Sequence, residues 1–349
     1  MPTLSSRSRR RWTRFTILVA AVVIAVVIID RVGQVEWPAV WDALSQLTWW
    51  QPLILLTMVA ARQLFKASPL HFYIENVSLG RATQNDLGAI LMATIAPAPA
   101  DYAIRVTMFT SWGLSAARGL AGATMNTVTV MVVRFALPLV GFIMLVMIGG
   151  DFSYRWADLF SLLISAAIAA CVLVVLHSDA LARAFGTHAG RIVGRIRRGV
   201  DPERWAQSCT DFRGHISARV RYGLPRSLAG VIAMVLADLA IVVFCLRFVG
   251  VSPAEVGILD IAIAYIFAFP LTILPFSGIA IVDSLIIAAL VQSGGHAVEA
   301  PAIAALVIWR VYTLGVPALA GLVAIGLWRR TTRRTTTDAA LAGHEPESP

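Results

Sequence analysis

Charged side chains inside long apolar stretches are the residues of this sequence best suited to bind a ligand. Arg134 lies near the middle of one apolar stretch, and Arg310 lies eight residues into the last one, which starts at Ala302. A charge at the centre of a membrane span costs roughly 2.5–3.5 kcal/mol on insertion scales, so it faces a cavity or a partner. A guanidinium group binds phosphate bidentately and keeps its charge when desolvated. The two arginines therefore predict a binding site for an anionic headgroup.

Other charged residues in or beside these stretches leave two interpretations open. They are Arg62, Asp101, Arg105, Asp238 and Asp283. In the first interpretation, the three aspartates pair with arginines and hold the helices together. In the second, Arg134 and Arg310 face a shared cavity and bind the headgroup. Asp101 and Asp283 then either pair with Arg105 and its neighbours or change protonation during transport. The arginines outnumber the buried acids, which favours an anion from outside the chain.

Two apolar stretches are interrupted by proline, each beside one of these acids. The residues that form the interruptions are Pro97 and Pro99 in the first, and Pro275, Ser277 and Gly278 in the second. A broken helix in lipid leaves backbone groups unpaired, so it persists only when buried in protein or lining a wet cavity. Paired breaks in the two halves of a chain are typical of a transport site near the bilayer midplane.

The composition predicts that these residues lie in an all-α polytopic membrane protein. The chain is 58% hydrophobic and 14% charged, with a mean hydropathy of +0.75. A span needs about 20 apolar residues. Six stretches approach or exceed this length: Phe15–Ile29, Pro52–Tyr73, Thr124–Met147, Trp156–Leu176, Leu228–Phe248 and Ala302–Trp328. We expect about six full spans, the first of them an uncleaved N-terminal one.

Arginine clusters predict the orientation of the spans. Five arginines precede the first span, ten lie in the loop 177–226, and four follow Trp328. Short basic segments stay in the cytoplasm, so both termini are predicted to be cytoplasmic. Residues 81–118 then begin and end inside, and residues 258–301 begin and end outside. Gln84–Ala96 forms about 20 Å of helix, too short to cross. We therefore expect two re-entrant hairpins, or short paired spans, in an inverted repeat.

The predicted organisation is one membrane domain between short tails. Residues 1–14 are a basic cytoplasmic tail, residues 15–328 the transmembrane domain with its basic loop 177–226, and residues 329–349 a disordered cytoplasmic tail. Within the loop, Leu181–Ile196 has an apolar stripe among arginines, which is typical of an amphipathic helix on anionic lipid.

The sequence predicts neither a metal site nor a cofactor. Cys171, Cys209 and Cys245 lack metal-ligand or redox spacing. An arginine cluster can bind nucleic acid, but here the cluster lies in a short membrane loop, so we do not expect a nucleic-acid partner. The expected partners are membrane lipids with anionic headgroups, including polyprenyl phosphates. The sequence leaves the oligomeric state open.

Two other functions compete with transport. A polyprenyl-linked glycosyltransferase would need external acids to bind a divalent metal, and Asp30, Glu36 and Asp42 are available. Three scattered acids are more often a solvated face. The chain could also be a membrane scaffold that transports nothing. We favour a transporter of the cytoplasmic (inner) membrane that is not an enzyme.

The residues around the two breaks resemble the lysylphosphatidylglycerol synthase transmembrane-region family, also called flippase-like domain proteins, over roughly residues 62–328. The first family motif is met by Pro97, Pro99, Ala100, Asp101 and Arg105, and the second by Pro275, Ser277, Gly278, Ala280 and Asp283. The family's two later arginines fall on Arg134 and Arg310. Val133 and Leu137 stand where the family often has acids. Ala280 replaces a glycine, and Asp283 replaces a glutamate.

The resemblance implies translocation of a lipid headgroup between leaflets. The cytosolic aminoacyl-transferase domain of bifunctional members has no counterpart after Trp328. We therefore do not expect lysylphosphatidylglycerol synthesis.

Overall fold

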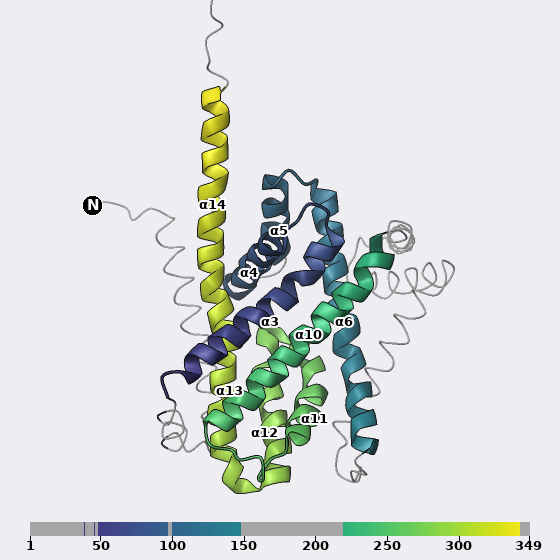
Figure 1. Ribbon diagram of the computed structural model, residues 1–349, viewed down its shortest axis with the longest axis vertical. Helices are drawn as coiled ribbons and strands as arrows, with labels where there is room; N and C mark the ends of the chain where they lie inside the picture. The colour runs from purple at the N-terminus through teal and green to yellow at the C-terminus, as the bar shows by residue number, and fades with distance from the viewer. Residues whose placement is uncertain (1–37, 39–44, 46–47, 97–99, 148–218, 343–349) are drawn as a thin grey trace, which may run out of the picture.

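The computed structural model describes residues 38, 45, 48–96, 100–147 and 219–342. Two predicted spans, Phe15–Ile29 and Trp156–Leu176, lie outside the described residues, as do Pro97, Pro99 and the predicted amphipathic helix Leu181–Ile196. The described part is helical throughout (Figure 1).

The described helices follow the same order in two halves of the chain. The first half contains α3 (Gln51–Tyr73), α4 (Leu79–Ile95), α5 (Ala100–Ser111) and α6 (Ala116–Met147). The second contains α10 (Arg219–Phe248), α11 (Ile258–Ala268), the 3-10 turns η1 (Phe269–Ile273) and η2 (Pro275–Gly278), and α12 (Ile281–Gly294). It ends with η3 (His296–Val298), α13 (Glu299–Arg310), the π-helical turn η4 (Val311–Gly315) and α14 (Val316–Ala342). Each half is thus a long helix, an interrupted pair and a second long element.

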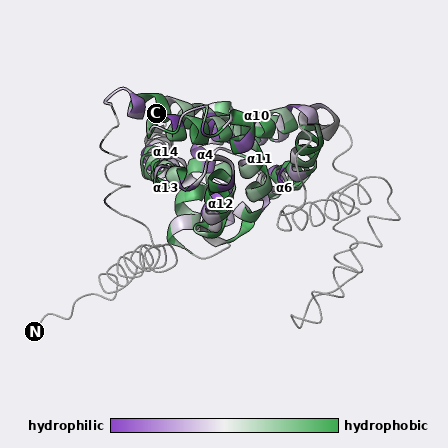
Figure 2. Ribbon diagram, turned by 90° about the horizontal axis from the view of Figure 1, so that it is seen from below, coloured by the Kyte–Doolittle hydropathy of each residue, from purple (hydrophilic) through white to green (hydrophobic). Residues whose placement is uncertain are grey.

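Four described segments are long and apolar enough to cross a membrane: Gln51–Tyr73, Ala116–Met147, Tyr222–Phe248 and His296–Thr332. They coincide with four of the six predicted spans. Large apolar side chains remain exposed on their outer faces, such as Ile143 on α6 and Leu319 on α14. Figure 2 shows hydrophobic residues along α6, α10, α13 and α14. Such faces suit lipid tails, so the protein is a multi-pass membrane protein.

Both interrupted pairs are present in the structure. Helix α4 ends at Ile95 and α5 begins at Ala100, on either side of the first proline-rich stretch. Helix α11 ends at Ala268, and α12 begins only at Ile281, after η1 and η2. Helix α4 begins five residues before the predicted Gln84, because the Ser78 side chain accepts the backbone N–H of Arg81 at 3.3 Å and caps it.

Helices α3 and α10 form an antiparallel pair through the middle of the molecule (Figure 1). At one end, the rings of Trp50 and Phe248 lie 5.6 Å apart in an edge-on arrangement. At the other, Gly223 packs against Phe72 and Tyr73. The pair of α4 and α5 lies toward one end of the molecule, and α11 and α12 lie toward the other (Figure 1).

Two glycines bring the halves into reciprocal contact. A Cβ on Gly141 of α6 would lie 2.9 Å from the Ile266 side chain of α11. A Cβ on Gly321 of α14 would lie 2.5 Å from the Leu87 carbonyl oxygen of α4. The last long element of each half therefore packs on the first short helix of the other half.

Replacing Gly321 tests the contact between α14 and α4. We expect Gly321→Ala to lower the free energy of unfolding by about 1–3 kcal/mol, because the methyl group meets backbone that cannot rotate away. Gly326→Ala is the matched control, since nothing lies within 4 Å of its Cβ position. Denaturant titration of both variants in detergent measures the difference. Equal stabilities would contradict the close contact.

The last helix does not end at Trp328, where we predicted a disordered tail to begin. It continues to Ala342. The sequence between Trp328 and Ala342 contains neither glycine nor proline, so nothing local stops the helix. The hydroxyl of Thr332 also bonds the carbonyl of Trp328 at 2.9 Å.

Candidate functional site

Asp238 is the centre of a buried polar cluster that joins four helices. Arg62 Nε of α3 lies 2.7 Å from Asp238 Oδ1 of α10. Tyr265 of α11 donates its hydroxyl to Asp238 Oδ2 at 2.7 Å, and Trp309 of α13 donates its Nε1–H to Oδ1 at 3.1 Å. Asp238 is only 3% exposed. The carboxylate is satisfied on both oxygens, so Arg62 and Asp238 form a structural pair, as the first interpretation predicted.

Asp283 and Arg310 form a second ion pair at the second break. Arg310 Nε and Nη2 lie 2.9 and 2.8 Å from Asp283 Oδ1. Arg310 Nη1 also donates to the Ser277 carbonyl at 3.3 Å. Arg310 is therefore paired with a carboxylate in this arrangement, as the first interpretation predicted. Asp283 neutralises it because α13 packs on α12.

Asp283 also satisfies the N-terminus of α12. Its Oδ2 accepts the Ala280 backbone N–H at 3.2 Å. The N-terminus of a helix carries partial positive charge, which would favour an anionic ligand at this break. In this arrangement the chain's own carboxylate uses that charge.

The backbone of the second break is strained. Ser277 and Ala280 have positive φ values of 57° and 72°, and Ala280 has ψ of −47°. Side-chain-bearing residues avoid this region, at a cost of order 1–3 kcal/mol each. Such strain is concentrated at functional segments. A π-helical turn, another feature common at functional sites, begins directly after Arg310.

Ala280→Gly should relieve this strain. We expect the variant to be about 1 kcal/mol more stable, because glycine reaches φ of 72° without a Cβ clash and the gain exceeds its extra entropy when unfolded. The midpoint of thermal unfolding should rise. Ala289→Gly, in the interior of α12, is the control and should lower the midpoint. A fall of the midpoint in both variants would contradict the strain.

Arg134 differs from Arg62, Arg105 and Arg310, each of which pairs with a carboxylate. Arg134 Nη1 lies 3.8 Å from the Met131 sulfur, and its guanidinium lies 5.8 Å from the centre of the Phe269 ring. Its Nε is buried without a hydrogen-bond partner. Within the described residues, no carboxylate pairs with Arg134. In the described part of the chain, its charge therefore has a thioether and an aromatic face as partners, both of them weak.

Arg134 and Arg310 approach the same interrupted segment from two helices. Arg134 of α6 contacts Phe269 in η1, whereas Arg310 of α13 contacts Ser277 in η2. The Tyr265 ring contacts a neighbour of each arginine: its centroid lies 5.5 Å from that of the Phe269 ring and 6.1 Å from that of the Trp309 ring. The sequence predicted that the two arginines share a site. The structure brings both to the second break, with a different partner for each.

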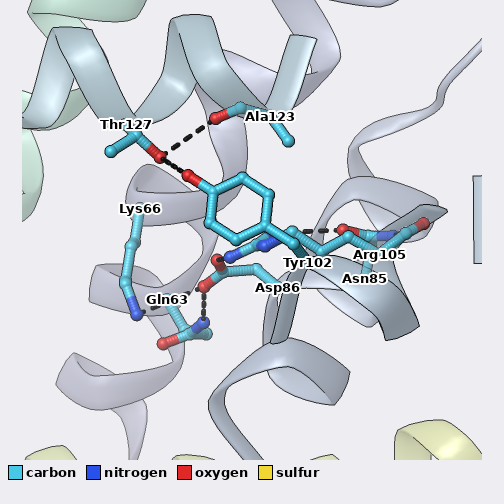
Figure 3. A network of polar contacts seen from close by, with 8 residues as sticks. All are labelled: Gln63, Lys66, Asn85, Asp86, Tyr102, Arg105, Ala123 and Thr127. Atoms are coloured by element: carbon cyan, nitrogen blue, oxygen red, sulfur yellow. Dashed lines mark hydrogen bonds and ion pairs between the residues drawn. The ribbon is translucent and has the colours of Figure 1, made fainter. Parts of the chain in front are cut away.

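Asp86 of α4 pairs with two cations near the first break (Figure 3). Arg105 Nη2 of α5 lies 2.6 Å from Asp86 Oδ1, and Lys66 Nζ of α3 lies 3.3 Å from Oδ2. Gln63 Nε2 donates to Oδ2 at 2.7 Å. Arg105 also donates to Asn85 Oδ1 at 3.1 Å.

The expected pair of Asp101 and Arg105 does not form. Arg105 turns instead to Asp86, which is 1% exposed, whereas Asp101 is half-buried at the start of α5. No hydrogen bond or ion pair joins the Asp101 carboxylate to another described residue. A buried carboxylate gains more from a cation than a solvated one does, which explains the choice.

Sequence reasoning missed Asp86, Lys66 and Gln63. The signal was present: Asp86 is a carboxylate in a short, mostly apolar helix, and Lys66 is the only lysine of the chain. Lys66 also follows Arg62 by about one helical turn, which places both on one face.

No group of three His, Cys, Asp or Glu that could hold a metal occurs in the part of the chain that the structure describes. Asp30, Glu36 and Asp42, the acids of the glycosyltransferase alternative, lie outside that part.

Comparison with curated proteins gives no match for this chain. A protein-family model, in contrast, matches most of the chain. The model describes the lysylphosphatidylglycerol synthase TM region and matches residues 15–321. The match includes both interrupted pairs and all the buried charges described above. This multi-pass membrane protein therefore belongs to the lysylphosphatidylglycerol synthase TM-region family.

Proposed function

We propose that the protein translocates an anionic lipid or a lipid-linked glycan across the cytoplasmic membrane, and that it is a transporter rather than an enzyme. Membership of a lipid-related membrane family supports this function. Both termini face the cytoplasm in this proposal, as the arginine distribution predicts.

The observation that carries the proposal is the unpaired guanidinium of Arg134. The described buried charges at Arg62, Asp86, Asp238, Asp283 and Arg310 all have an oppositely charged partner. Arg134 has none in the described part of the chain. An uncompensated charge in a span costs a few kcal/mol. Retaining it is reasonable if an anion binds there, and a lipid phosphate is the anion that a membrane supplies.

The geometry of the halves supports an inverted repeat as the transport machinery. The order of helices recurs, α3 and α10 are antiparallel, and Gly141 and Gly321 make reciprocal contacts between the halves. In such repeats, one half moves against the other around a site at broken helices. In this proposal, the ion pair of Arg310 and Asp283 holds α13 and α12 together in the unliganded state and breaks when the lipid binds. When the headgroup phosphate reaches the second break, it competes with Asp283 for the Arg310 guanidinium.

Transport by the purified full-length protein in vesicles tests the function. Fluorescent phosphatidylglycerol and phosphatidylcholine, added in separate vesicles, report the fraction of label that a membrane-impermeant quencher reaches. We expect the protein to speed exchange of the anionic lipid between leaflets and to leave the zwitterionic lipid near the rate of empty vesicles. Arg226→Gln is a matched control, because Arg226 is exposed and its guanidinium lies on the neighbouring Tyr222. Equal rates with and without protein would refute transport of this lipid class.

A further inference from the structure

The cluster around Asp86 contains more positive charge than its acid can balance. Two cations, Lys66 and Arg105, share the one carboxylate of Asp86. Asp86 Oδ1 accepts Arg105 at 2.6 Å, and Oδ2 accepts Gln63 at 2.7 Å. Among the described residues, the ion-pair contact of Lys66 is therefore a long one of 3.3 Å, to an oxygen that already accepts from Gln63. The cluster keeps a net charge of about +1 with both cations protonated.

Lys66 is the most exposed charged side chain of the cluster. The Lys66 side chain is 31% exposed, whereas those of Arg105 and Asp86 are 13% and 1% exposed. An ammonium group has three donors, and Asp86 is the one ion-pair partner of Lys66 among the described residues, so donors remain for a ligand. Figure 3 shows the ammonium group of Lys66 beside Gln63 and the Asp86 carboxylate.

The side-chain oxygen of Gln63 is a second feature that indicates a ligand. It is 4% exposed, and its Oε1 is buried without a hydrogen-bond partner, while its Nε2 is held by Asp86. A buried acceptor without a donor costs about 1–3 kcal/mol. A ligand that carries a hydroxyl would supply the donor, and an oxyanion on the same ligand would bind Lys66.

We propose that Lys66, Arg105 and Gln63 form a second binding site, at the contact of α3, α4 and α5, for an anionic phosphate ester with a hydroxyl-bearing headgroup. The site is separate from the Arg134 site, because it is built by the first interrupted pair and lies toward the opposite end of the molecule from α11 and α12 (Figure 1). The phosphate oxygens accept from Lys66 and, by displacing part of the Asp86 contact, from Arg105.

The single lysine makes the site measurable by chemical labelling. An amine-reactive ester can modify only Lys66 and the N-terminal amine, and peptide mass spectrometry separates the two. The rate of Lys66 acylation is followed in the full-length protein, in phosphatidylcholine vesicles with and without phosphatidylglycerol. A third sample contains inorganic phosphate, with chloride at matched ionic strength as its control.

We expect phosphatidylglycerol to slow acylation of Lys66 about tenfold, the protection given by a ligand at roughly ten times its dissociation constant. Protection by inorganic phosphate alone would identify a free phosphate ester, rather than a lipid, as the ligand. Both results support the site. An acylation rate that neither phosphatidylglycerol nor inorganic phosphate changes would overturn it.

Two variants separate this site from the Arg134 site. Arg105→Lys keeps the charge that Asp86 needs but loses the forked donor, so it should weaken protection while the protein still folds. Arg134→Gln should leave protection intact, because Arg134 belongs to the other site. Full protection in Arg105→Lys together with loss in Arg134→Gln would overturn a separate site at Lys66. A failure of lipid transport would leave this result unaffected.

Discussion

Arg134→Leu should make the protein more stable and inactive at the same time. Leucine removes a charge that the described chain does not balance, and it fits between Met131 and Phe269. We expect the free energy of unfolding to rise by about 2 kcal/mol, a large part of the cost of an unpaired charge in a span. Transport of phosphatidylglycerol should fall about 100-fold, because the phosphate loses its charged partner. Denaturant titration and the vesicle assay measure the two effects.

The opposite signs distinguish function from structure. If Arg134 held the fold together, its loss would lower stability and transport together. Arg134→Lys is the matched variant: it keeps the charge but loses bidentate binding, so we expect intermediate transport at nearly unchanged stability. A loss of stability in Arg134→Leu would mean that Arg134 has a structural partner, and the proposed role would be wrong.

Asp238→Asn should be among the most destabilising single changes in the described core. The substitution leaves Arg62 buried without a counter-charge. The single amide oxygen of Asn replaces the two carboxylate oxygens, so one of the hydrogen bonds from Tyr265 and Trp309 keeps its acceptor. Removing one partner of a buried ion pair costs about 3–5 kcal/mol. We expect a loss in that range, measured by denaturant titration of the purified protein.

A double variant and a control isolate the charge. Arg62→Gln with Asp238→Asn should recover part of the loss, because no unbalanced charge remains. Asp260→Asn, at the exposed start of α11, should change stability little, since its contact to the Gly257 N–H survives in the amide. If the stability loss of the double variant equals the sum of the losses of the two single variants, the ion pair is not the source of stability.

The helices and their breaks could be predicted from the sequence because their causes are local. Apolar length predicted four segments at which the structure has helices long and apolar enough to cross a membrane. Proline-rich stretches predicted the interruptions between α4 and α5 and between α11 and α12. The presence of ionisable residues inside spans also pointed to Arg62 and Asp238, because charges in lipid require partners.

The pairing of the charges could not be predicted, because it depends on how helices rotate and pack. Arg62 and Asp238 are 176 residues apart in sequence. Asp101 and Arg105 are spaced to meet on one face of α5, yet Arg105 pairs with Asp86 on the neighbouring helix. Similarly, the sequence suggested that Arg134 and Arg310 are alike, but only Arg310 has a carboxylate within reach in the described chain.

Native mass spectrometry of the detergent-purified protein tests most directly whether Arg134 binds an anionic headgroup. The wild-type protein and Arg226→Gln are offered an equal mixture of phosphatidylglycerol and phosphatidylcholine, in parallel with Arg134→Gln. We predict that the first two retain a phosphatidylglycerol molecule under activation that strips phosphatidylcholine, and that Arg134→Gln retains one fewer. Identical lipid retention in all three proteins would contradict the account.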